Sequence, residues 1–137
     1  MPGWPIPPEF PLTDLLGQEV TQVCVGLGQI QIHLYKQQQP GAPDKWRPGA
    51  RIEAEAAFSL GNAGLLPRRV EQQDFRQTGG TLTSLLGQTV IEVRRETGNE
   101  LQLVFSGGQA LVLHTDPQGF ESYHLYIAGE SVTVTRA

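Results

Sequence analysis

The chain has 137 residues and a formal net charge of −4, with ten basic side chains against fourteen acidic ones. A globule of this length buries roughly two-thirds of its unfolded surface, enough for one core without a metal or a disulfide. The scattered basic residues exclude a phosphate-tracking surface, and no apolar run reaches the ~20 residues of a membrane span. We expect a single soluble domain, residues 1–137, that needs no cofactor and binds neither nucleic acid nor a membrane.

The beginning of the chain predicts an arm rather than a strand. Residues 1–11 contain five of the ten prolines, which lack a backbone donor and cannot join the centre of a sheet. Trp4, Ile6 and Phe10 are expected to anchor this arm to the core. The same segment lacks the basic and apolar regions of a secretory signal, so we expect a cytoplasmic protein.

A nine-residue motif organises the rest of the chain. The stretch LTDLLGQEV, which begins at Leu12, recurs as LTSLLGQTV from Leu82, with seven identical positions. Such self-similarity indicates one unit written twice. We assign residues 12–64 to the first copy, 65–80 to a connection and 81–137 to the second copy. Each motif predicts a short helical turn that ends at a glycine and leads into a strand.

The first copy predicts a hairpin, a long loop and a third strand. Residues 20–25 are rich in valine and contain the only cysteine, Cys24, whose thiol we expect to be buried. Residues 29–35 alternate polar and apolar, which predicts Ile30, Ile32 and Leu34 on the core face and the polar residues on the other. Residues 36–49 predict a loop, and residues 51–60 predict one strand that pairs with 29–35.

The second copy repeats this order with tighter turns. Its expected strands are 89–95, 101–105, 110–114, 122–127 and 131–135. About eight short strands without an extended helical period predict an all-β antiparallel fold, either a sandwich or a partly closed barrel, with an internal pseudo-two-fold repeat. Residues 12–60 and 82–127 are therefore predicted to superpose, with Leu16 on Leu86 and Ile32 on Leu103.

The repeated pattern resembles a family of small bacterial proteins of uncharacterised function. That family carries a twice-repeated L-G-x-x-V, L-x-L-x-F-x-D-G, L-x-V and Y-E-x-W pattern, and the resemblance covers most of residues 12–135. The chain departs from it in the Gly107-Gly108 turn, where the family tends to Asp-Gly, and at Tyr123, where tryptophan is more usual. The resemblance implies a single two-copy β domain and no activity. Some members look like partners of bacterial toxins, which suggests an immunity-type binding role by association.

Two clusters of polar residues are candidates for a functional site. His114, Asp116, Glu121 and His124 lie within eleven residues and could form a nitrogen and oxygen site for a divalent metal; the alternative is a solvated loop. His33 is expected opposite Glu53 and Glu55 on the neighbouring strand, where a carboxylate could orient the imidazole; the alternative is an ordinary cross-strand polar contact. No nucleophile or glycine-flanked serine motif accompanies either group, so no catalytic residue is predicted.

The long loop of the first copy is the strongest candidate for partner binding. Trp46 lies near its tip between Lys45 and Arg47, a combination typical of binding hot spots. The alternative is that Trp46 covers the open end of the sheet. We expect a non-enzymatic module that binds another protein, with its oligomeric state left open. The residues assigned to that surface are Trp46, Lys45, Arg47, Tyr35, His33, Glu53 and Glu55.

Overall fold

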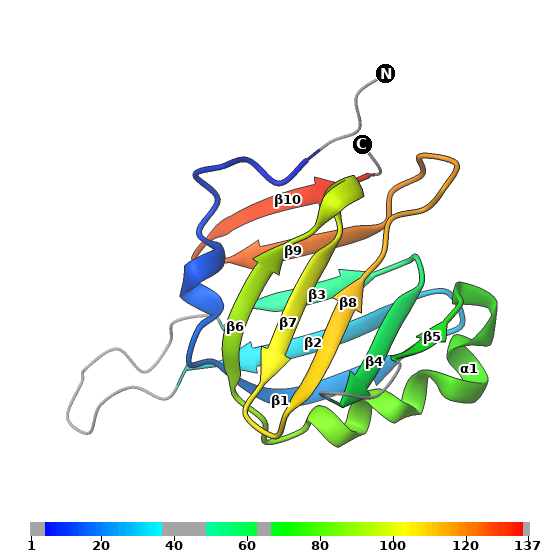
Figure 1. Ribbon diagram of the computed structural model, residues 1–137, viewed down its shortest axis with the longest axis horizontal. Helices are drawn as coiled ribbons and strands as arrows, with labels where there is room; N and C mark the ends of the chain where they lie inside the picture. The colour runs from blue at the N-terminus through cyan, green and yellow to red at the C-terminus, as the bar shows by residue number, and fades with distance from the viewer. Residues whose placement is uncertain (1–4, 37–48, 63–66, 136–137) are drawn as a thin grey trace.

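The computed structural model describes residues 5–36, 49–62 and 67–135, and these form a sandwich of two five-stranded antiparallel sheets (Figure 1). The sheets stay separate rather than closing into a barrel, and their strands cross steeply in Figure 1, as in orthogonal packing. The prediction of an all-β sandwich is confirmed, with ten strands instead of about eight. The strands are β1 (Glu19–Val25), β2 (Ile30–Tyr35), β3 (Arg51–Ala54), β4 (Phe58–Asn62), β5 (Arg68–Val70), β6 (Val90–Arg95), β7 (Leu101–Phe105), β8 (Gln109–Leu113), β9 (Tyr123–Ile127) and β10 (Glu130–Val134).

Each half of the chain contributes strands to both sheets. The first sheet has the order β1-β2-β3-β9-β10, and the second has β6-β7-β8-β4-β5. In the first half, β1 to β3 lie in the first sheet, and β4 and β5 lie in the second. In the second half, β6 to β8 lie in the second sheet, and β9 and β10 lie in the first. The expectation that residues 51–60 form one strand is wrong. The backbone N–H groups of Glu55 and Ala56 both donate to Ser122 O, at 2.8 and 3.1 Å, and the chain leaves the first sheet there.

The two copies of the nine-residue motif pair with each other where the sheets meet. The first four residues of each copy lie in a 3-10 helix, which is η1 (Leu12–Leu15) in the first copy and η3 (Gly79–Leu85) in the second. Each copy then passes through a glycine with φ near +80°, Gly17 or Gly87. Four reciprocal backbone bonds join the copies. They run from Gly17 N to Val90 O, Gly87 N to Val20 O, Val20 N to Gln88 O and Val90 N to Gln18 O, each 2.9 Å long.

The core lies between the sheets and follows the predicted alternation. Ile30, Ile32 and Leu34 of β2 are buried, which confirms the predicted inward face, while Gln31 and His33 between them are partly exposed. On the opposite sheet β7 buries its alternate residues in the same way. Burial of a leucine or isoleucine side chain contributes roughly 1.5–3 kcal/mol, so these two faces supply much of the stability.

The segment predicted as the connection between the copies, with a short extended piece around Val70, contains that strand and further ordered structure. It holds β5, the 3-10 helix η2 (Gln72–Asp74), the short helix α1 (Phe75–Thr78) and the start of η3. Val70 and Phe75 are buried, and the Phe75 ring lies 5.7 Å from that of Phe58. Polar residues around these two apolar anchors hide any period in the sequence. As Figure 1 shows, α1 and η3 close one end of the sandwich.

The proline-rich arm packs onto the core, as expected for its described part. Ile6 and Phe10 are buried, and the Arg95 guanidinium donates to Ile6 O at 2.6 Å and Pro7 O at 2.7 Å. Trp4 lies outside the described residues. Cys24 is half-buried on β1 rather than fully buried, because its side chain points to the outer face of the sheet beside Gln31. No helix in the described ranges is long and apolar enough to cross a membrane.

Candidate functional site

Polar side chains form a connected row on the outer face of the first sheet. His33 Nε2 lies 3.1 Å from Gln31 Oε1, and Gln31 Nε2 donates to Gln29 Oε1 at 2.9 Å. Gln29 Nε2 in turn lies 3.5 Å from Glu55 Oε1. The row runs along β2 because alternate residues of a strand share one face. It ends at Glu55, which directly follows β3, and therefore leads toward the neighbouring strand β9.

The register of β2 and β3 corrects the predicted contact between His33 and the two glutamates. His33 lies opposite Arg51, and Gln31 lies opposite Glu53. Glu53 forms its ion pair with Arg51, at 2.9 Å between Oε1 and Nε. The arginine also lies over the Tyr126 ring, 4.2 Å from its centroid. The predicted histidine and carboxylate pair is thus replaced by an arginine held between a carboxylate and an aromatic ring.

The predicted cluster of His114, Asp116, Glu121 and His124 is divided between the two sheets. His114 follows β8 in the second sheet, and His124 lies on β9 in the first. Asp116 belongs to the intervening turn, where its carboxylate accepts a bond from Gln118 N at 2.7 Å. Only Glu121 and His124 come together, with 3.9 Å between Oε2 and Nε2. The change of sheet between β8 and β9 separates the two histidines.

Glu55 joins this remaining pair from the neighbouring strand. Its Oε1 lies 3.7 Å from His124 Nε2, and one ligand atom of each of Glu55, Glu121 and His124 lies within 4.8 Å of the others. His124 Nδ1 lies 2.9 Å from Thr133 Oγ1 on β10. When Nδ1 donates to that hydroxyl, Nε2 presents its lone pair to the carboxylates. The group combines one residue expected for partner binding with two expected for a metal.

A second polar group, which the sequence did not predict, lies on the outer face of the second sheet. Ser59 Oγ lies 2.6 Å from His114 Nε2, and His114 Nδ1 lies 2.9 Å from Glu100 Oε2. Ser59 is the second residue of β4, His114 directly follows β8, and Glu100 directly precedes β7. The three residues lie far apart in the sequence, and adjacent strands bring them into one line.

The two groups occupy corresponding places in the two halves of the chain. Glu55 follows β3 as His114 follows β8, and His124 is the second residue of β9 as Ser59 is of β4. Gln29 and Glu100 likewise precede β2 and β7. Each pair of corresponding residues has the same position relative to the strands that follow its copy of the nine-residue motif. This correspondence is hidden in the sequence, because the alternation of residues 51–60 runs through the boundary between β3 and β4.

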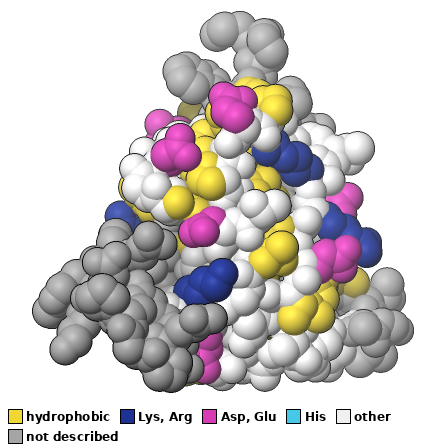
Figure 2. Space-filling view, turned by 90° about the vertical axis from the view of Figure 1, so that its left-hand side faces the viewer, with side chains coloured by type: hydrophobic (Ala, Val, Ile, Leu, Met, Phe, Trp, Pro, Cys, Tyr) yellow, Lys and Arg dark blue, Asp and Glu magenta, His cyan; other side chains and the backbone are white. Residues whose placement is uncertain are grey.

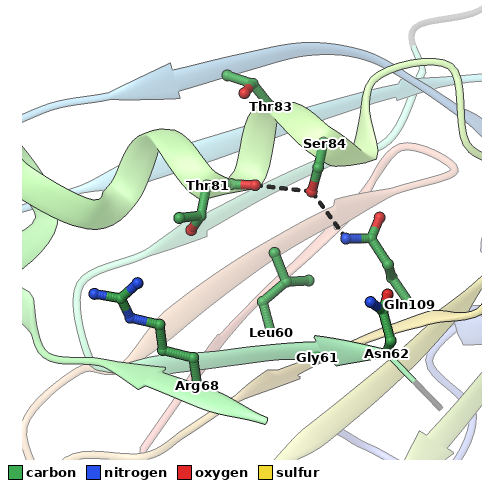
Figure 3. Close-up of a pocket in the computed structure, with 8 residues that line it drawn as sticks. All are labelled: Leu60, Gly61, Asn62, Arg68, Thr81, Thr83, Ser84 and Gln109. Carbon is green, nitrogen blue, oxygen red and sulfur yellow. Dashed lines mark hydrogen bonds between the residues drawn. The ribbon is translucent and has the colours of Figure 1, made fainter. Parts of the chain in front are cut away.

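A cavity of about 420 Å³ lies between η3 and the edge of the second sheet (Figure 3). Ser84 accepts a bond from Gln109 Nε2 at 2.9 Å and donates to Thr81 O at 2.9 Å. Arg68 extends from β5 toward the same space and is the one charged side chain in its described wall. The wall consists of Leu60, Gly61, Asn62, Arg68, Thr81, Thr83, Ser84 and Gln109.

A second cavity of similar volume, about 420 Å³, borders the group on the second sheet. Its wall includes Glu100, which contacts His114, and Arg69, the cross-strand neighbour of Ser59. Thr97, Gly98, Thr115 and Pro117 complete the described wall. The cavity is mostly polar and places a positive charge near the Ser59 strand.

Of the remaining predicted site residues, Tyr35 ends β2 opposite Glu19, and its side chain is exposed. Trp46, Lys45 and Arg47 lie outside the described residues. Figure 2 shows acidic, basic and apolar side chains interspersed on the face seen there, without a basic stripe among its described residues. Comparisons with protein-family models, curated proteins and solved structures find no match to this chain.

Proposed function

We propose that the chain binds a divalent transition-metal ion, with zinc as the best fit, through Glu55, Glu121 and His124. The observation that carries this proposal is the convergence of three ligand atoms within 4.8 Å of one another at the outer face of the first sheet. Imidazole nitrogen and carboxylate oxygen are ligands that zinc takes at about 2.0–2.2 Å. Three protein ligands leave the remaining position to water, which makes this an open site rather than a closed structural one.

The geometry of the three donors suits an ion at their centre. Donors bound at about 2.1 Å with tetrahedral or octahedral angles lie roughly 3.0–3.5 Å apart. The distances of 3.7 and 3.9 Å from His124 Nε2 to the carboxylates are slightly longer. The Glu121 side chain is 65% exposed and that of Glu55 is 38% exposed, while His124 is only 15% exposed. Contraction around the ion therefore requires a small movement of both carboxylates toward His124.

Thr133 supports the proposal as an outer partner of His124. A ligating histidine commonly donates its second N–H to an oxygen, which sets the tautomer and the ring orientation. Thr133 Oγ1 lies where that donation is expected, 2.9 Å from Nδ1. Because a histidine must lose its proton to bind a metal, the affinity is expected to fall as the pH is lowered.

Calorimetric titration of the untagged protein with zinc chloride tests the proposal. We expect one ion per chain, and His124→Ala to weaken binding by at least about tenfold. Thr133→Val should weaken it by a smaller factor, since it removes only the orienting oxygen. His33→Ala is the matched control, because His33 lies on the same sheet face and has no carboxylate opposite it. Equal zinc affinity in His124→Ala and the wild-type protein would reject the site.

A second proposal is protein binding through the same outer face. The observation that favours it is Arg51, which lies over the Tyr126 ring at 4.2 Å and pairs with Glu53 at 2.9 Å. Arginine and tyrosine are enriched at binding hot spots, and here both are held in fixed positions before a partner arrives. Capture from a native cell lysate that Tyr126→Ala abolishes, and that Arg94→Ala on the other sheet leaves intact, would support this role. A cytoplasmic location and an immunity-type role stay predictions.

A further inference from the structure

Ser59, His114 and Glu100 form a hydrogen-bonded line with defined proton positions. An ionised carboxylate can only accept, so His114 Nδ1 must donate its proton to Glu100 Oε2 across 2.9 Å. In the neutral imidazole Nε2 then carries a lone pair and accepts the Ser59 hydroxyl proton across 2.6 Å. This is the arrangement of a nucleophile, a general base and an orienting carboxylate, which is recognised by geometry and roles rather than by sequence order.

We propose that Ser59 is a nucleophile activated by His114, that Glu100 orients the imidazole, and that the chain cleaves small activated acyl esters. This activity is independent of the metal proposed for the first sheet, because the two groups lie on different sheets. Ser59 is only 5% exposed, so we expect a small acyl group to react in preference to a long one. The neighbouring cavity of about 420 Å³ is lined by Glu100 and Arg69, and we expect the leaving group to depart on that side.

The surroundings hold the three residues in place. His114 N donates to Ala57 O at 3.0 Å, which fixes the end of β8 beside the start of β4. Ser59 pairs with Val112 on one side and Arg69 on the other within the sheet. Arg69 Nε contacts Glu71 Oε1 at 2.7 Å, which holds the guanidinium in the cavity wall. As the cross-strand neighbour of Ser59, Arg69 is the candidate to stabilise the negative charge that develops on a carbonyl oxygen under attack.

The corresponding positions in the first sheet indicate that the fold itself does not require this line. There Gln29, Glu55 and His124 occupy the equivalent places, with separations of 3.5 and 3.7 Å. The same backbone arrangement therefore accommodates a different set of polar side chains without a serine. The short contacts of His114 with Ser59 and Glu100 in the second sheet therefore depend on the particular side chains at these positions. Such contacts are expected if the line transfers a proton.

The reaction proceeds in two steps, acylation of Ser59 and hydrolysis of the acyl group. Ser59 Oγ bonds to the ester carbonyl carbon as its proton passes to His114 Nε2. The carbon to oxygen bond of the ester then breaks, and His114 returns the proton to the departing alkoxide. Water attacks the acyl group on Ser59 and gives a proton to His114, which passes it to the serine oxygen as the carboxylic acid leaves. Water is the only co-reactant, and no electrons are exchanged with an outside group.

Covalent labelling with a small fluorophosphonate, read by mass spectrometry of peptides, tests the proposal together with hydrolysis of 4-nitrophenyl acetate. We expect one adduct on Ser59 in the folded protein and none in Ser59→Ala. His114→Gln should slow labelling and hydrolysis by about 10²–10⁴-fold. Ser84→Ala is the matched control, since Ser84 is an exposed serine on η3 with a different set of partners. EDTA should leave the rates unchanged.

Two further measurements separate catalysis from structural support. A denaturant midpoint for each variant shows whether it is folded, and only folded variants are compared. Glu100→Gln should alter the pH dependence of labelling as well as its rate, because the amide no longer fixes the tautomer of His114. Absence of an adduct on Ser59 in the folded wild-type protein would overturn the proposal. Labelling that persists at the wild-type rate in folded His114→Gln would overturn it equally.

Discussion

Replacement of Gly17 and Gly87 by alanine, one at a time, probes the pairing of the two motif copies. Both glycines have a left-handed backbone, with φ of +84° and +81°. A Cβ added at Gly87 meets nothing within 4 Å, and one at Gly17 meets only Lys36 Cε at 3.7 Å, so neither change causes a clash. A left-handed alanine costs about 1–2 kcal/mol, and the lower entropy of the unfolded chain offsets about 0.4–1 kcal/mol of that. Each substitution should therefore lower the free energy of unfolding by about 1 kcal/mol.

Urea unfolding followed by circular dichroism measures these changes, with an unchanged m-value as the sign that only stability has shifted. Gly80→Ala is the matched control, because Gly80 has no left-handed φ and its added Cβ also meets nothing within 4 Å. That control should be neutral or slightly stabilising. The reasoning is refuted if Gly80→Ala destabilises as much as the other two, or if the Gly17 and Gly87 variants differ by more than about 1 kcal/mol.

Two other predictions concern the core. Tyr123→Phe should cost about 1–2 kcal/mol, because it removes the hydroxyl that donates to O of the half-buried Asn99 at 2.6 Å and leaves that acceptor without this donor. Burial, aided by the charge of Glu100, raises the pKa of Tyr123. The wild-type protein should therefore lose stability above pH about 10, where tyrosine ionises in the unfolded chain but not in the folded one. Urea titrations across that range should show a smaller loss for the phenylalanine variant. Leu15→Ala and Leu85→Ala each empty a fully buried site and should each cost about 2–5 kcal/mol in thermal unfolding; a difference above about 2 kcal/mol would contradict equivalent packing of the two motifs.

Sequence patterns predicted those parts of the fold that depend on neighbouring residues. The alternation around Ile32 determined which face of β2 is buried, because a strand exposes successive side chains on opposite sides. The break between β3 and β4 was not predictable in this way. The residues from Ile52 to Leu60 keep the same alternation through the break, and no glycine or proline marks it. The chain changes sheet there because Ser122 O, far away in the sequence, accepts two of its backbone N–H groups.

Contacts between residues distant in the sequence also limited the prediction of the candidate sites. His114 and His124 are close in the sequence, but the chain crosses from one sheet to the other between them. Glu55 and His124 are far apart in the sequence, and the pairing of β3 with β9 brings them together. Residue types alone identified His124 and Glu121 as possible ligands. Their third partner required the strand order, which local periodicity does not contain.

The distribution of each half of the chain over both sheets has a consequence for how such a molecule could arise. A single unit of about sixty residues, with three strands in one sheet and two reaching into another, leaves both sheets incomplete. Two separate copies of that unit would complete each other by exchanging their last two strands, as a domain-swapped homodimer does. Joining the copies into one polypeptide replaces association between molecules with folding within one. The two halves are then free to diverge in sequence, because only the pairing between them, and no longer their identity, has to be preserved.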